Sequence, residues 1–105
     1  MPYLIVELLR CTREDFPGWV ECRLIDADGR AHRFEEKAPV VSAQLRGDAA
    51  FPQPGAIACE RVGEREDASG RRRVQVDTRH PWSVQSDTGL TRFEVLASQV
   101  LERAR

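Results

Sequence analysis

The chain lacks most of the motifs on which common catalytic and metal sites depend. It has two histidines and three cysteines among 105 residues, and no Cys-x-x-Cys pair or paired-histidine motif that would suggest zinc. It also contains no P-loop, no dinucleotide-binding glycine fingerprint and no nucleophile-elbow serine. These absences disfavour an enzyme, and we predict neither a metal nor a cofactor.

Lysine and long apolar runs are scarce as well. Lys37 is the single lysine among 16 basic residues. Arginine suits phosphate recognition, but replacement of lysine by arginine also follows from a GC-rich coding bias. The net charge of −1 and the pI of 6.1 disfavour a nucleic-acid footprint, which normally makes a domain basic. No stretch approaches the roughly 20 apolar residues of a membrane-spanning helix, so a membrane location is not predicted.

The amino-terminal run and the cysteines indicate a cytoplasmic protein. The first apolar stretch is interrupted by Glu7 and has neither the basic leader nor the cleavage site of a secretory signal. Cys11, Cys22 and Cys59 cannot all pair within one chain, and each lies in an apolar strand pattern. We therefore expect reduced thiols and a reducing compartment.

Short β-branched and aromatic stretches alternate with turn signals along the chain. An apolar fraction of 41% over 105 residues suits one compact domain. The pattern predicts an all-β fold: one small antiparallel, barrel-like domain of six or seven strands over residues 1–105, with a short helical turn near the carboxyl end. The predicted strands are Tyr3–Cys11, Trp19–Asp26, Arg30–Glu36, Ala56–Val62, Arg72–Thr78 and Leu90–Ala97, with a weaker one at Val40–Leu45.

Polar segments are predicted to connect these strands. Phe16-Pro17-Gly18 closes the first hairpin, Gly63–Gly70 is an exposed loop, and Ser86–Gly89 is a further turn. The segment Arg46–Gly55 contains two prolines, which cannot donate to a ladder, so it is expected to cross an end of the barrel. Phe51 at its centre is expected to plug the core.

The string "IDADGRAHRF" raises the question of a calcium loop. In an EF-hand that begins at Asp26, the glycine comes two residues early and Arg30 occupies a ligand position. We interpret the string as a hairpin turn over residues 27–29, with Gly29 left-handed and Asp26 accepting backbone amides. This register places Leu24 opposite His32 and Cys22 opposite Phe34 on the core face, with Arg23 and Glu21 on the other face.

Cys22 and His32 are the candidate catalytic residues. A cysteine nucleophile beside a histidine base is a known arrangement. Diagonal cross-strand neighbours lie about 7–8 Å apart, however, and the sequence reveals no third residue to orient the histidine. The favoured interpretation is a histidine at the end of the core that bonds to a backbone carbonyl.

A second set of candidate residues is basic and aromatic. Arg71, Arg72, Arg73, Arg79 and Trp82 could bind phosphates and stack bases. Acidic neighbours in the same hairpin would offset much of that charge, which favours a solvated hairpin tip for the first three. For Trp82 the sequence favours a core position over a contact position.

The motifs resemble a group of small uncharacterised bacterial β-proteins. The resemblance rests on "GWVECRLIDADGRAHRFEEKAPVV", "FPQPGAIACERV" and "GLTRFEV" in this order, and it covers residues 18–95. It implies no activity and no catalytic residue. More loosely, the order of strands and turns is similar to the β-barrel modules of translation elongation factors, a likeness of architecture alone.

Three hypotheses follow from the sequence. The preferred one is a small cytoplasmic protein-binding module, of an accessory or immunity type and without catalytic activity. The second is a single-stranded nucleic-acid-binding barrel, and the third is an enzyme that uses Cys22 and His32. The identity of the partner and the oligomeric state stay open.

Overall fold

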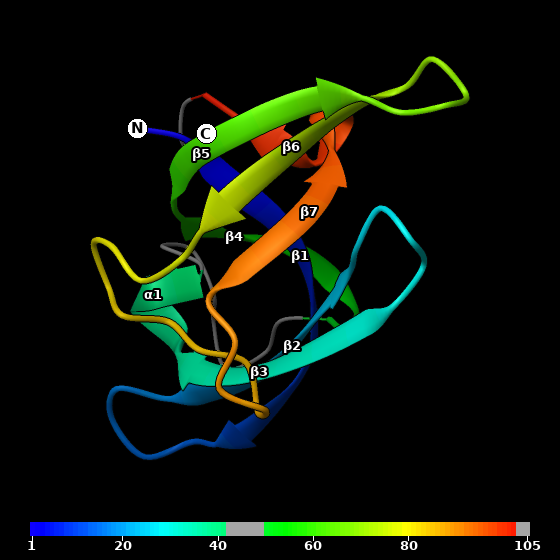
Figure 1. The fold of residues 1–105 in the computed structure, drawn as a ribbon. Helices are drawn as coiled ribbons and strands as arrows, with labels where there is room; N and C mark the ends of the chain where they lie inside the picture. The colour runs from blue at the N-terminus through cyan, green and yellow to red at the C-terminus, as the bar shows by residue number, and fades with distance from the viewer. Residues whose placement is uncertain (42–49, 103–105) are drawn as a thin grey trace.

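The computed structural model describes residues 1–41 and 50–102, which form two antiparallel sheets (Figure 1). The first sheet has the strand order β3-β2-β1-β4, and the two-residue β8 pairs with the start of β1. The second has the order β5-β6-β7. The strands are β1 (Tyr3–Arg13), β2 (Trp19–Ile25), β3 (Ala31–Lys37), β4 (Gln53–Ala58), β5 (Glu60–Glu66), β6 (Arg72–Asp77), β7 (Arg92–Leu96) and β8 (Val100–Leu101).

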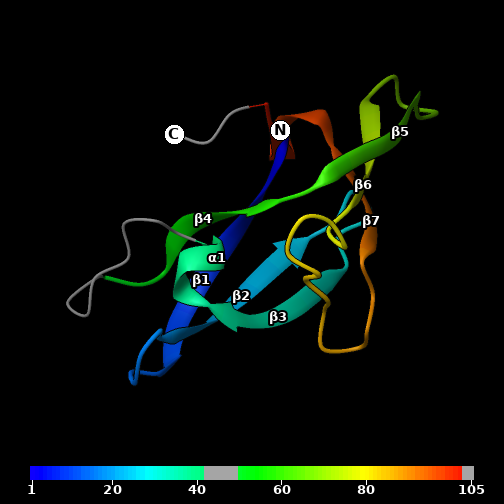
Figure 2. The ribbon, with the colours of Figure 1, turned by 90° about the vertical axis from the view of Figure 1, so that its left-hand side faces the viewer.

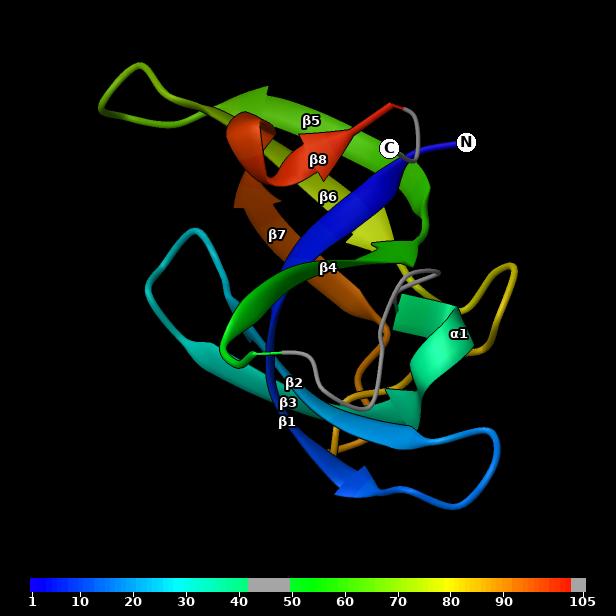
Figure 3. The same cartoon turned by 180° about the vertical axis from the view of Figure 1, so that it is seen from behind.

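In the part of the chain that the structure describes, helical structure is limited to two short elements. α1 (Ala38–Val41) follows β3, and the 3₁₀ turn η1 (Ala97–Gln99) lies between β7 and β8. Seen from behind, η1 and β8 lie beside the start of β1 (Figure 3). The predicted helical turn near the carboxyl end is therefore confirmed. Within residues 1–41 and 50–102, no helix is long and apolar enough to cross a membrane.

The core lies between the two sheets, which Figure 2 shows side by side. Alternate residues of β1 and β2 point into it, because successive side chains of a strand face opposite sides. Phe34 from β3 meets Phe93 from β7 edge to face, with ring centroids 5.6 Å apart. Phe51 packs against this core while partly exposed, as predicted. The buried apolar residues are Leu4, Val6, Leu8, Val20, Cys22, Leu24, Phe34, Val41, Ile57, Ala58, Cys59, Val74, Val76, Val84, Phe93, Val95 and Val100.

The predicted hairpin register of β2 and β3 is confirmed. Cys22 pairs with Phe34 and Leu24 with His32. Gly29 has a φ of 80°, in the left-handed region that suits glycine. The carboxylate of Asp26 accepts the backbone N–H groups of Asp28 and Arg30, each at 2.9 Å. The turn chemistry thus fixes which side chains enter the core.

The all-β prediction is confirmed, but neither sheet closes into a barrel. Closure requires a continuous ladder around the ring. Between the β2–β3 hairpin and β7, the N–H of Ala27 donates a hydrogen bond to the carbonyl of Glu94 at 2.9 Å. A second isolated bond joins Asp87 N–H to Arg33 O at 2.8 Å. These isolated bonds connect the first sheet to β7 and to the loop before it without forming a ladder.

Several predicted boundaries are wrong. The predicted strand Ala56–Val62 is two strands in different sheets, because the chain leaves the first sheet at Cys59. The expected loop Gly63–Gly70 supplies the end of β5 and only a tight turn. Gln53–Gly55 belongs to β4, an edge strand of the kind that tolerates proline. The weak strand at Val40–Leu45 begins as α1, and the rest of it lies outside the described residues.

Candidate binding loop at the end of β6

Cys22 and His32 occupy one hairpin but have different partners. The thiol of Cys22 is fully buried and donates to the carbonyl of Val20 at 3.8 Å. Burial, with smaller contributions from nearby glutamates, raises its pKa to about 12. A thiol that stays protonated at neutral pH is a poor nucleophile. The contacts of Cys22 are those of a structural core residue.

His32 is held by a carboxylate rather than by a backbone carbonyl. Its Nε2 lies 2.8 Å from Oδ2 of Asp26, and both side chains are mostly buried. Its ring meets Phe93 edge to face, with centroids 5.0 Å apart. Sequence reasoning placed Asp26 at the turn but missed it as the partner of His32. The predicted register already contained this information. It pairs Leu24 with His32, which places Asp26, two residues after Leu24 in the same hairpin, close to the His32 ring.

Carboxylates neutralise the arginines at the β5–β6 turn. Nε of Arg71 lies 3.9 Å from Asp67, and Arg72 donates to Glu64 at 2.9 Å. Arg73 contacts three carboxylates, at 2.7 Å from Asp28, 2.9 Å from Asp67 and 3.2 Å from Glu94. These pairs leave little free positive charge at the hairpin tip.

The structure does not bring the two halves of the predicted basic set together. Arg71–Arg73 lie at the start of β6, and Arg79 and Trp82 follow its end. A strand rises about 3.3 Å per residue, so β6 separates the two halves by roughly 20 Å. Arg79 and Trp82 therefore belong to a site of their own.

That site is the display loop, residues Arg79–Ser83, which is closed at its base by two buried residues. Thr78 and Val84 are each 0% exposed. The N–H of Val84 donates to the carbonyl of Thr78 at 3.0 Å, and Oγ1 of Thr78 donates back to the carbonyl of Val84 at 2.7 Å. The N–H of Ser83 closes a further turn onto Arg79 at 2.7 Å. These bonds fix the path of the loop.

All five residues of the display loop are exposed, and Trp82 is 60% exposed. The expectation of a buried Trp82 is therefore wrong. Val84, two residues later, occupies the core in its place. Ser83 has a φ of 54°, a left-handed conformation that non-glycine residues seldom adopt and that often occurs at functional sites.

A buried carboxylate supports the loop from below. Oδ1 of Asp77 accepts the N–H of Arg79 at 2.8 Å, and Oδ2 pairs with Nε of Arg92 at 3.1 Å. The hydrogen bond from Arg79, together with the Arg92 contact, lowers the pKa of Asp77. The side chain of Arg92 is 72% exposed. Asp77 is therefore ionised at neutral pH. Its carboxylate fixes the start of the display loop at Arg79 and binds the side chain of Arg92.

No group of three or more histidine, cysteine or acidic side chains within the described part of the chain could hold a metal ion. Comparison of the chain with protein-family models, with curated proteins and with solved structures finds no match. The motif resemblance to small bacterial β-proteins stays a prediction. The function is therefore inferred from the geometry of the site alone.

Proposed function

We propose that this protein is a small protein-binding module that docks through the display loop, with Trp82 as the anchor. The observation that carries the proposal is an indole held in solvent by a loop whose base is buried and hydrogen-bonded. Tryptophan and arginine are enriched among the residues that dominate binding energy. A loop already fixed in one path loses less conformational entropy on binding.

The loop also suggests the chemistry of the partner. Trp82 calls for an apolar pocket, and Arg79 on the same loop calls for acidic groups at the rim of that pocket. A partner of this kind is a folded protein surface. Occupying such a surface is how an accessory or immunity-type protein would act, without chemistry of its own.

The other two hypotheses have less support. A single-stranded nucleic acid needs a basic track alongside its stacking residues. Arg71–Arg73 are paired with carboxylates and lie at the far end of β6 from Trp82. An enzyme that uses Cys22 and His32 would need a reactive thiol, whereas Cys22 is buried with a raised pKa.

The test is a comparison of captures from a lysate of the source cells. Immobilised wild-type protein and a Trp82→Ala variant are compared with Leu90→Ala, the matched control. Leu90 is 45% exposed and lies in a different turn. We expect a partner that wild type and Leu90→Ala retain and that Trp82→Ala loses. A partner retained equally by all three proteins would refute the loop as the docking site.

The nucleic-acid alternative has its own readout. The Trp19→Phe substitution leaves Trp82 as the only indole of the protein. A single-stranded oligonucleotide of mixed sequence is added to this variant while the tryptophan fluorescence is recorded. We expect a flat fluorescence titration at low salt. Salt-sensitive quenching would instead favour the nucleic-acid hypothesis.

A further inference from the structure

The turn between β2 and β3 contains the single Asp–Gly pair of the sequence, Asp28–Gly29. At such a pair the backbone nitrogen of the glycine can attack the side-chain carboxyl group of the aspartate, because glycine has no side chain to hinder the approach. Every other aspartate precedes alanine, threonine or phenylalanine, and the sequence has no asparagine. Asp28–Gly29 is therefore the bond of this chain most prone to that reaction.

The reaction needs no co-reactant other than water. The nitrogen of Gly29 forms a bond to Cγ of Asp28, and the hydroxyl group of the carboxyl leaves as water with the amide proton. A second water molecule then opens the five-membered imide. Where it adds to the main-chain carbonyl carbon of Asp28, the chain continues through Cγ, and an isoaspartyl residue replaces aspartate without a change in mass.

The turn leaves room for this ring. The side chain of Asp28 is 53% exposed, and Gly29 is exposed as well. Apart from the chain neighbours of Gly29, no heavy atom lies within 4 Å of the position that a side chain there would take. Packing on the side of Gly29 therefore does not block ring closure.

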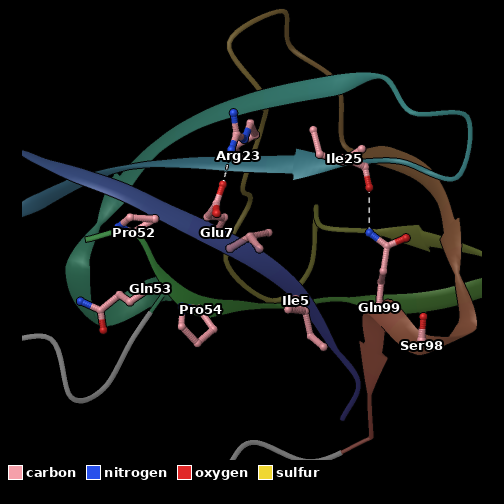
Figure 4. Close-up of a pocket in the computed structure, with 10 residues that line it drawn as sticks. Ile5, Glu7, Arg23, Ile25, Pro52, Gln53, Pro54, Ser98 and Gln99 are labelled. Carbon is pink, nitrogen blue, oxygen red and sulfur yellow. Dashed lines mark hydrogen bonds and ion pairs between the residues drawn. The ribbon is translucent and has the colours of Figure 1, made fainter. Parts of the chain in front are cut away.

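Hydrogen bonds hold the backbone of the turn in an unreactive conformation. The N–H of Gly29, which belongs to the attacking group, donates to the carbonyl of Asp26 at 3.0 Å. The residue before the turn is also fixed, because the side-chain amide of Gln99 donates to the carbonyl of Ile25 at 2.7 Å (Figure 4). The bond from Gly29 must break before its nitrogen can attack.

Arg73 holds the second reacting group. Its Nη1 lies 2.7 Å from Oδ1 of Asp28. The Arg73 side chain is 12% exposed and is fixed in turn by Asp67 and Glu94. Ring closure turns the Asp28 carboxyl group toward the nitrogen of Gly29, so it requires the contact with Arg73 to break. A side chain held in this way reaches the geometry for attack less often.

We propose that Asp28 is a site of spontaneous isoaspartate formation and that Arg73 limits its rate in the folded protein. The modification lengthens the backbone of the turn by one carbon atom. It also removes the contact that joins the β2–β3 hairpin to Arg73 on β6. The display loop follows β6 and contains none of these residues, so the proposal is independent of the proposed function.

The test is the rate of isoaspartate formation in the folded full chain at pH 6 and 37 °C. A protease that cleaves before aspartate but not before isoaspartate, followed by mass spectrometry, measures this rate over several weeks. We expect isoaspartate at residue 28 in wild type. We expect it to form about three- to fivefold faster in Arg73→Gln, as for the loss of one partly exposed ion pair.

Glu94→Gln is the matched control, because it also removes a partner of Arg73 but leaves the Asp28 contact in place. It is expected to react at the wild-type rate. Asp28→Ser gives the blank, since it copies Ser69 at the same place in the turn that Asp67 begins. Wild type in concentrated sodium chloride, which screens ion pairs, is expected to react faster than at low salt.

The two parts of the proposal fail separately. Absence of isoaspartate at residue 28, both in the folded protein and in urea, would overturn the site. Equal rates in wild type and Arg73→Gln would overturn the role of Arg73, as would an equal acceleration by Glu94→Gln. If Arg73→Gln does not fold, the salt comparison decides, and a rate that salt leaves unchanged would overturn that role.

Discussion

At the residue scale, the two buried cysteines differ from the third. Cys22 and Cys59 are buried, and burial is the main cause that raises their pKa values to about 12 and about 11. Cys11 is exposed. The sequence placed all three in strands, but strand pattern does not distinguish a thiol on the inner face from one near the exposed end of β1.

We expect one cysteine to react with iodoacetamide in the folded protein at pH 8. Cys11 should be modified at the rate of an ordinary exposed thiol, and Cys22 and Cys59 only after unfolding, because their thiolates are scarce and shielded. Peptide mass spectrometry after timed quenching measures this. Fast labelling of Cys22 in the native protein would revive the Cys22 and His32 enzyme.

The same pKa values predict weaker stability in alkali. The ordinary cysteine pKa is 9.0, so above pH 9 the unfolded chain loses thiol protons that the folded protein keeps. The stabilisation present below pH 9 is therefore lost as the pH rises toward about 12. Thermal melts of wild type and Cys22→Ala between pH 7 and 10.5 should show a shallower decline for the variant. Parallel curves would contradict this.

At the element scale, two hairpin turns use the same residues in the same way. Asp26 and Asp67 each begin an Asp-Ala-x-Gly-Arg turn and accept the backbone N–H groups two and four residues later. Each also holds the side chain six residues on, His32 in one hairpin and Arg73 in the other. The sequence pattern identified the first turn from its glycine and missed the second. The end of β5 is polar, so the pattern predicted a loop over Gly63–Gly70.

Arg73 joins these two turns. It bonds to Asp67 of its own hairpin and to Asp28 of the other, and its side chain is 12% exposed. We expect Arg73→Gln to lower the melting temperature by several degrees, because three carboxylates each lose one partner at once. Arg72→Gln is the control, since Arg72 is 61% exposed and pairs with Glu64. Equal melting temperatures for the two variants would show that the joint contributes nothing.

Local chemistry explains which elements the sequence predicts well. The β2–β3 register follows from Asp26, Gly29 and strict alternation, all within one short segment. The change of sheet at Cys59 cannot be predicted from the neighbouring residues. The string "AIACERV" has the pattern of one continuous strand, and the sheet that each half joins depends on packing against distant residues. Val84 rather than Trp82 enters the core for a similar reason. The path of the segment that connects β6 to β7 decides which of the two side chains faces inward.

At the scale of the whole molecule, polar contacts across the three strands of the second sheet carry a pH dependence. Glu94 on β7 accepts from Arg65, Gln75 and Arg73. These contacts, led by the hydrogen bond from Arg65, lower its pKa to about 2 from an ordinary 4.5. Because the folded pKa is depressed, the stabilisation is present above pH 4.5 and is lost as the pH falls toward about 2.

We therefore expect Glu94→Gln to lower stability at pH 7 and to reduce the loss of stability between pH 5 and pH 2. Urea unfolding followed by circular dichroism at several pH values measures both effects. Glu60→Gln is the control, because Glu60 is an exposed residue on β5. A Glu94→Gln variant with the acid dependence of wild type would refute this assignment.

The whole molecule combines a core between two open sheets with a loop that holds Trp82 in solvent. The most direct test of its role is the acrylamide quenching of Trp82 in a Trp19→Phe variant, measured alone and with the captured partner. In the free protein, we expect red-shifted emission and strong quenching, as for a 60% exposed indole. In the complex, the emission should shift to the blue and the quenching should fall several-fold. Unchanged emission and quenching in a formed complex would contradict docking through the display loop.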